Sequence, residues 1–148
     1  MHHYIEPGNA IELQFFETNE TGQKLLVGKH PGLVLDIIDG YIYFLPISIT
    51  YRRNDGTIYA YKRHKNNPKG LIRNINLNVI GKIPIANYEL WFSIGKKEFL
   101  YILKAFIICQ EAKAAKVENY AKIKAKIEET YGPELAKTIV KKPPNCRG

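Results

Sequence analysis

The sequence predicts an α+β fold, a small and strongly twisted antiparallel half-barrel with a long C-terminal helical segment packed on it. Over the first 92 residues, short apolar runs alternate with polar residues, which is typical of strands with one buried face. From Ser93 onward the apolar residues recur at helical spacing instead. Because many short strands come first and helices last, we expect a curled sheet with helices on it, not a layered α/β fold.

The 148 residues are expected to form a single domain with three parts. Residues 1–92 form mainly the β half-barrel, residues 93–142 are helical, and residues 143–148 are a tail.

One predicted hairpin organises the β part. Leu33–Ile38 is an apolar, β-branched run, Asp39-Gly40 is a dipeptide that favours a two-residue hairpin turn, and Tyr41–Leu45 is the returning strand. Antiparallel pairing would bring Lys29 and His30 close to Ser48. An ammonium, an imidazole and a hydroxyl would then share one edge of the sheet.

The remaining strands are predicted from shorter patterns. They are Asn9–Phe16, Lys24–Val27 (a short strand or the end of a loop), Thr57–Tyr61, Gly70–Ile80, Ile83–Ile85 and Tyr88–Trp91. Within Gly70–Ile80 the asparagines 74, 76 and 78 alternate with apolar residues, which predicts a half-buried strand. Gly81-Lys82 is expected to be a turn, and Pro84 favours an edge strand or an extended loop.

Helical spacing begins after Ser93–Lys96 and can continue to about Tyr131, with a break near Glu111–Val117 as an alternative. Gly132-Pro133 is expected to end the helix, and Glu134–Lys142 to add a further helical piece.

Charge and composition limit the partners. The formal net charge of +8 favours an anionic partner, with nucleic acid first and a membrane surface second, although a basic surface can also serve solubility alone. No segment has the ~18 apolar residues that a membrane-spanning helix needs, and the N-terminus lacks the apolar stretch of a signal peptide. Two cysteines give no disulfide framework and no metal quartet, so we expect a reducing, cytoplasmic compartment and no membrane.

The order of these segments resembles the MazF/PemK-like toxin group. The resemblance is carried by Pro7–Leu13, by His30–Leu35 where that group has Arg-Pro-x-Leu-Val-Leu, and by Pro46-Ile47-Ser48. Asn74–Leu77, Ile83–Ile85 and the long helical C-terminus resemble its ToxN/AbiQ branch, the type III toxins. The resemblance covers most of residues 7–110.

This resemblance implies an SH3-like half-barrel and a metal-independent endoribonuclease toxin of a toxin–antitoxin system. It implies no cofactor. The implied partners are substrate mRNA and a small repeated antitoxin RNA that binds the toxin directly in a closed hetero-oligomeric RNA–protein assembly. Growth arrest or abortive phage infection, a form of antiviral defence, would follow.

The resemblance also assigns catalytic residues. The catalytic Arg of the MazF type aligns with His30, whereas the catalytic Lys of the type III branch aligns with Lys29, so the main catalytic group is one of these two. Ser48 matches one hydroxyl of a Thr-Ser pair, and Thr50 can supply the other.

The residue types fit this chemistry. RNA supplies its own nucleophile, the 2′-hydroxyl, so the enzyme needs only proton transfer and cations that stabilise the phosphorane. The imidazole of His30 suits proton transfer near neutral pH, while Lys29 or Arg52 can hold the non-bridging oxygens, and Ser48 can donate a hydrogen bond. No His, Asp or Glu cluster has the spacing of metal ligands, so no metal is expected.

RNA binding is predicted at two further segments. Tyr51, Arg52 and Arg53 combine stacking with phosphate contact. The second segment is a basic loop formed by Lys62, Arg63, His64, Lys65 and Lys69. Two alternatives remain open: a non-catalytic nucleic-acid-binding module on an SH3-like barrel, and a toxin of the same fold that a protein antitoxin inhibits.

Overall fold

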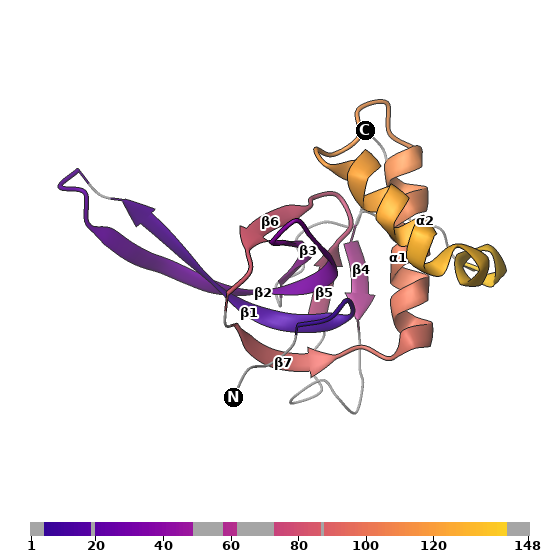
Figure 1. Ribbon diagram of the computed structural model, residues 1–148, viewed down its shortest axis with the longest axis horizontal. Helices are drawn as coiled ribbons and strands as arrows, with labels where there is room; N and C mark the ends of the chain where they lie inside the picture. The colour runs from indigo at the N-terminus through magenta and orange to yellow at the C-terminus, as the bar shows by residue number, and fades with distance from the viewer. Residues whose placement is uncertain (1–4, 19, 49–57, 62–72, 87, 142–148) are drawn as a thin grey trace.

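The computed structural model describes residues 5–18, 20–48, 58–61, 73–86 and 88–141; for residues 14–18, 24–30, 48, 58–61 and 73 it describes the backbone alone. Its elements are β1 (Asn9–Thr18), β2 (Lys24–Ile38), β3 (Tyr41–Ser48), β4 (Ile58–Tyr61), β5 (Arg73–Asn76), β6 (Gly81–Pro84), β7 (Glu89–Ser93), α1 (Lys96–Glu111) and α2 (Tyr120–Lys137). The α+β class is confirmed, because antiparallel strands are followed by two helices (Figure 1).

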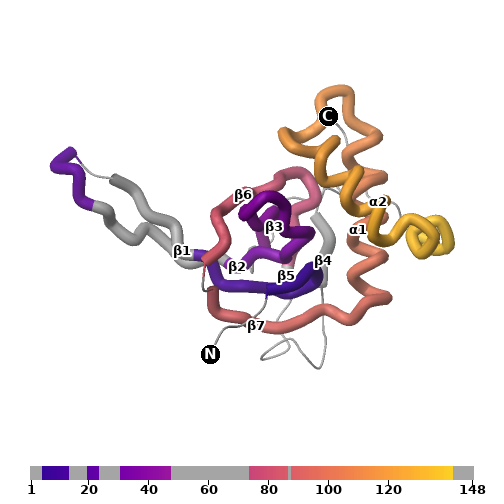
Figure 2. Tube along the Cα trace, viewed as in Figure 1, coloured from indigo at the N-terminus to yellow at the C-terminus, as the bar shows by residue number. Residues whose placement is uncertain are grey.

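The sheet is curled because two strands share one edge of β3. Its order is β4-β5-β3-β2-β1-β7, and β6 pairs with β3 outside this path. Tyr41–Phe44 of β3 pair with β6, whereas Ile47 and Ser48 pair with β5. The strands thus form a small twisted half-barrel, and the two helices lie on one side of it (Figure 2).

The central hairpin is confirmed. Asp39 and Gly40 have φ values of 51° and 81°, the pair of positive values that a type I′ turn requires. The strands pair from Ile38 opposite Tyr41 to Gly32 opposite Pro46. A bulge between Val34 and Asp36 adds one residue to β2 and increases its local twist.

β1 and β2 form a hairpin whose strands are longer than the predicted segments Asn9–Phe16, Lys24–Val27 and Leu33–Ile38. β2 is a single strand from Lys24 to Ile38, so Lys24–Val27 belongs to it and is not the end of a loop. The outer parts of the two strands, Leu13–Thr18 and Lys24–His30, pair with each other and project from the half-barrel (Figure 1). We call these two segments the arm.

Apolar residues fill both faces of the sheet. The helical spacing after Ser93 is confirmed by its burial, since Phe99, Ile102, Leu103 and Phe106 of α1 all pack into the larger cluster between helices and strands. The opposite face buries a smaller cluster, formed by Ile11, Leu13, Val34, Ile42 and Phe44. Apolar packing on both faces of the sheet therefore stabilises the half-barrel.

The helical segment follows the alternative with a break. α1 ends at Glu111 and α2 begins at Tyr120. The predicted stop at Gly132-Pro133 is wrong, because α2 continues through Pro133 to Lys137. Gly132 has no Cβ to clash with the proline ring, and burial of Leu135 just beyond holds the last turn against the core.

The predicted turn at Gly81-Lys82 is also wrong. Both residues belong to β6, and the turn lies earlier, at Leu77 and Asn78. Gly81 is required there for close packing, because a Cβ at this position would lie 2.1 Å from Phe44 Cζ. β6 pairs only with β3 among the described strands, which agrees with the edge position that Pro84 favours.

Two observations concern the predicted compartment. Cys109 is buried in α1 and disulfide-bonded, which differs from the reduced thiols that we expected and that a cytoplasmic protein favours. None of the helices in the described residues is both long and apolar enough to cross a membrane. The cytoplasmic location stays a prediction.

Candidate functional site

Lys29 and His30 lie on β2 where the arm leaves the half-barrel. Their positions are opposite Gln14 and Leu13 of β1. They come three and two residues before Gly32, the last β2 residue that pairs with β3. The structure thus gives these two residues a defined backbone position at the base of the arm.

Ser48 is the last residue of β3 and lies two residues beyond Pro46, the partner of Gly32. His30 and Ser48 therefore follow the same terminal pair of the β2–β3 ladder, each within about 7 Å along its own strand at about 3.3 Å per residue. The described ladder stops before the two residues become direct partners, because β2 continues beside β1 and β3 turns toward β5. They share one end of this ribbon, and their chemical roles stay predictions.

The other predicted site residues fall outside the described part of the chain. They are Thr50, Tyr51, Arg52, Arg53, Lys62, Arg63, His64, Lys65 and Lys69. Their assignments to catalysis and RNA binding therefore also stay predictions.

Asn74 is a polar residue that the sequence analysis did not assign to the site. It lies on β5, directly opposite Ser48 on β3 and Ala60 on β4. Only 3% of Asn74 is exposed, so the strand that the alternation predicts to be half-buried is buried on its asparagine side at this position. Neither Oδ1 nor Nδ2 of Asn74 has a hydrogen-bond partner in the described structure.

A buried amide without partners costs about 1–3 kcal/mol of stability. Native proteins keep few such groups, and the ones they keep call for an explanation, such as a ligand. Asn74 thus adds two free hydrogen-bonding atoms beside Ser48. No sequence signal separates Asn74 from Asn76 and Asn78, which alternate with apolar residues in the same way.

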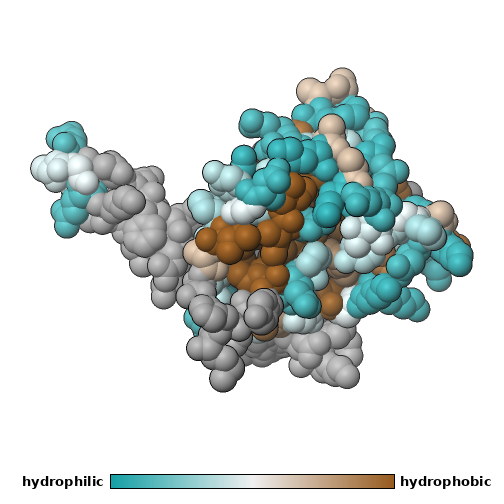
Figure 3. Space-filling model, viewed as in Figure 1, coloured by the Kyte–Doolittle hydropathy of each residue, from teal (hydrophilic) through white to brown (hydrophobic). Residues whose placement is uncertain are grey.

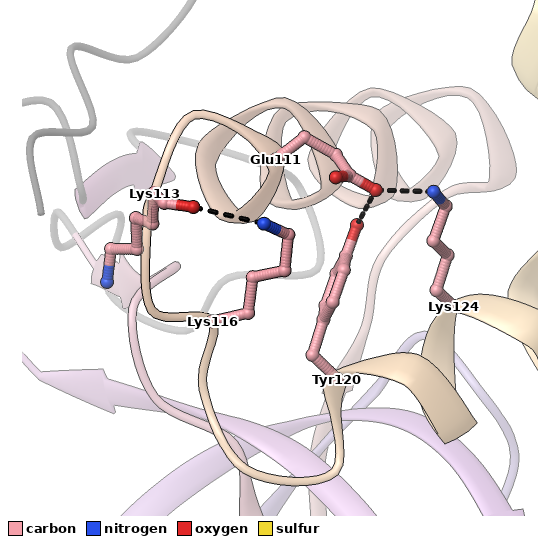
Figure 4. Close-up of polar contacts among 5 residues, drawn as sticks. All are labelled: Glu111, Lys113, Lys116, Tyr120 and Lys124. Atoms are coloured by element: carbon pink, nitrogen blue, oxygen red, sulfur yellow. Dashed lines mark hydrogen bonds and ion pairs between the residues drawn. The ribbon is translucent and has the colours of Figure 1, made fainter.

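A second polar cluster joins the two helices (Figure 4). Glu111 accepts a hydrogen bond from Lys124 and another from the Tyr120 hydroxyl at 3.0 Å. These hydrogen bonds lower the pKa of Glu111, while burial raises the pKa of Tyr120. Lys116 Nζ donates to the backbone oxygen of Lys113 at 3.0 Å. Two lysines are therefore engaged in contacts within the α1–α2 corner.

The face that Figure 3 shows is not uniformly polar. Hydrophobic side chains gather over the strands in its centre, and hydrophilic ones cover the helices. The large exposed apolar residues of the described chain are Tyr41, Val79, Ile85, Leu90 and Ile139. Lys82 Nζ lies 4.3 Å from the centroid of the Tyr41 ring, a cation–π contact.

The helices enclose a hollow of about 250 Å³ that shares no residue with the candidate site. Its lining is mostly apolar and comes from both helices, at Lys104, Ile107, Ile108, Glu128, Gly132, Leu135 and Ala136. Among the residues that the structure describes, no three His, Cys, Asp or Glu side chains lie together as metal ligands.

Comparison with protein-family models, with curated proteins and with solved structures found no match for this chain.

Proposed function

We propose that this protein is a metal-independent endoribonuclease toxin of the MazF/PemK-like group, in its ToxN/AbiQ branch, built on an SH3-like half-barrel. The observation that supports this most is the common position of Lys29, His30 and Ser48 at one end of the β2–β3 ribbon. The unpaired amide of Asn74 beside Ser48 and the net charge of +8 agree with a site for an anionic polymer.

The proposed reaction is transesterification within the RNA. The 2′-oxygen attacks the adjacent phosphorus as its proton leaves to a base, and the bond from phosphorus to the 5′-oxygen breaks. The leaving 5′-oxygen takes up a proton, so the products are a 2′,3′-cyclic phosphate and a 5′-hydroxyl. His30 or Lys29 transfers protons, a cation stabilises the phosphorane, and Ser48 donates a hydrogen bond to it.

The biological proposal follows from the same resemblance. A small repeated RNA binds the toxin and blocks cleavage of mRNA, and release of the toxin arrests growth or aborts a phage infection. RNA extracted from the native complex after removal of protein would then be short and of repeated sequence. A protein antitoxin in place of this RNA would contradict the type III assignment while leaving the nuclease proposal intact.

The decisive experiment incubates the purified protein with RNA in excess EDTA and identifies the new ends. We expect cyclic phosphate and 5′-hydroxyl ends, and a rate that falls roughly 100-fold or more in Lys29→Ala or Ser48→Ala. Lys97→Ala is the matched control, because Lys97 is an exposed lysine on α1 and its removal lowers the net charge equally. Loss of cleavage in EDTA would contradict the mechanism.

A non-catalytic nucleic-acid-binding module is the second candidate, and the basic charge alone supports it. Such a module would bind RNA with a strong dependence on salt and leave it intact after long incubation. Expression in a bacterium separates the two candidates, because only the nuclease should stop growth.

A further inference from the structure

The corner between the two helices carries half of the net charge of the chain. Residues 113–126 contain five lysines and one glutamate, a net charge of +4 out of the total of +8. The lysines are Lys113, Lys116, Lys122, Lys124 and Lys126. We call residues 113–126, which join the end of α1 to the first turns of α2, the basic corner (Figure 4). None of them belongs to the candidate site.

Most of this charge is not neutralised within the described chain. Lys124 forms a salt bridge with Glu111, whereas Lys116 donates to the backbone oxygen of Lys113, which carries no net charge. Lys113 is only 8% exposed, yet its ammonium has no hydrogen-bond or ion-pair partner among the described residues. Figure 4 shows this ammonium pointing away from Glu111. The basic corner therefore keeps ammonium groups that no carboxylate of the described chain pairs with.

The order of charges along α2 opposes the stability of the helix. The N-terminal end of a helix favours acidic side chains, and the C-terminal end favours basic ones. Lys137 in the last turn follows this preference, but the first turn contains no acidic residue. Lys122 and Lys126 are four residues apart, where like charges on a helix repel each other. The acidic residues of α2 come later, at Glu128, Glu129 and Glu134. Because this order costs stability, an external anionic partner explains it better than the helix itself does.

The start of α2 adds to the same positive field. Asn119 is the N-cap of α2, but its side chain forms no capping hydrogen bond. The positive end of the helix dipole therefore lies in the basic corner without a side-chain acceptor from its N-cap. Phosphate groups bind at helix N-termini, and lysine binds phosphate as a point charge that needs no fixed geometry.

We propose that the basic corner binds the phosphate backbone of RNA and holds the RNA outside the site where it is cleaved. The choice of RNA as the anionic partner rests on the proposed function. Tyr120, the single aromatic residue of the corner, is buried, so we expect contacts to phosphates and not to bases. An anionic membrane fits less well, because none of the large exposed apolar side chains of the described chain lies between residues 112 and 137.

The test measures binding of single-stranded 2′-O-methyl RNA, which has no free 2′-hydroxyl to attack its own backbone, between 50 and 200 mM salt. In the double variant Lys113→Gln/Lys122→Gln, the slope of log affinity against log salt concentration should become shallower by about 1.4, since two phosphate contacts are lost. Binding at 100 mM salt should weaken roughly tenfold or more. Arginine at both positions should restore the native slope.

The matched control is Lys97→Gln/Lys141→Gln, which removes the same charge from two exposed lysines outside the corner. Its slope should stay close to that of the native protein. Equal slopes in the two glutamine variants, or tighter binding to phosphatidylserine vesicles than to RNA, would overturn the proposal. A protein that binds RNA with these slopes but never cleaves unmodified RNA would contradict the nuclease and leave this inference intact.

Lys122→Glu separates binding from folding. An acidic residue in the first turn of α2, four residues before Lys126, should raise the midpoint of thermal unfolding by about 1–3 °C. The same change should weaken RNA binding more than Lys122→Gln does, because it reverses the charge. Native RNA affinity in Lys122→Glu would overturn the proposal.

Discussion

Ser48 and Asn74 occupy opposite positions on β3 and β5, and the amide of Asn74 is buried there without a hydrogen-bond partner among the described residues. Ser48 follows Pro46, which forms the last β2–β3 pair with Gly32. Lys29 and His30 precede Gly32 on β2. A protein that keeps an unpaired amide beside a candidate catalytic hydroxyl gives up stability at that point. We propose that this amide gains a partner when RNA binding opens the site, because both of its polar atoms are buried in this structure.

Asn74→Ala therefore separates activity from stability. We expect cleavage of RNA to fall about tenfold or more, the effect of losing one hydrogen bond to substrate. The free energy of unfolding should change by less than about 1 kcal/mol, because removing the unpaired amide offsets the packing that is lost. Cleavage rates and thermal unfolding of the variant measure the two effects.

Asn76→Ala is the control for this prediction. The side chain of Asn76 accepts the backbone N–H of Asn78 at 2.8 Å in the following turn. Its removal should cost about 1 kcal/mol of stability and leave cleavage unchanged. If Asn76→Ala lost activity as Asn74→Ala does, the effect would be on the strand and not on the site.

Gly81→Ala should destabilise the fold by about 1–3 kcal/mol, because a Cβ would lie 2.1 Å from Phe44 Cζ in a packed core. The measurement is urea unfolding. Adding Phe44→Leu should recover part of the loss, since the obstacle is the aromatic ring. Gly95→Ala is the comparison: apart from Gly95 and its two chain neighbours, no atom lies within 4 Å of the Cβ position, so this change should cost much less.

The local chemistry of turns and helices was predictable from sequence, while tertiary packing was not. Asp39-Gly40 specifies its own turn through two positive φ values, so the hairpin is correct in the sequence analysis. Gly132-Pro133 usually ends a helix, but burial of Leu135 outweighs that local preference. Gly81 was interpreted as a turn residue, although its role is to make room for Phe44.

In the candidate site, too, the local pattern was predictable from sequence and the tertiary packing was not. The hairpin pattern predicted the β2–β3 ladder, and Lys29, His30 and Ser48 lie just beyond its last pair on the two strands. Asn74 was missed because alternation indicates a polar face without indicating whether water reaches it. Pairing on both sides, by β3 and by β4, belongs to the fold and not to the local sequence.

Asp36→Asn should stabilise the protein at neutral pH. Asp36 is only 8% exposed, and burial raises the pKa of its carboxyl above the usual value, although it accepts the Ile37 N–H at 2.7 Å. Because this pKa is higher in the folded state than in the unfolded chain, the folded protein keeps a proton that the unfolded chain has released. The free energy of unfolding therefore falls as the pH rises from about 4 through the folded pKa. An asparagine can keep the hydrogen bond without the buried charge.

The measurement is urea unfolding of both proteins between pH 4 and pH 8. The advantage of Asp36→Asn should be smallest at the acid end and grow with pH. Lys126 acts in the opposite direction, since its charge favours the ionised carboxyl. A variant that was less stable than the native protein at pH 7 would show that this attraction outweighs burial.

Gln110→Ala should be among the more damaging polar substitutions, because this side chain joins three parts of the fold. Gln110 is fully buried on α1, donates from Nε2 to the backbone oxygen of Leu77 at 2.8 Å, and accepts the N–H of Val117 at 3.0 Å. Its removal leaves the Leu77 carbonyl and the Val117 N–H without these hydrogen-bond partners, which costs about 1–3 kcal/mol for each group. We therefore expect a loss of about 2 kcal/mol or more in urea unfolding, with faster hydrogen exchange at Val117.

The neighbouring change Glu111→Gln alters an exposed pair with Lys124 and should leave stability nearly unchanged, because water screens such pairs. If the two variants were equally stable, the α1–α2 corner would depend on its apolar packing and not on this buried amide.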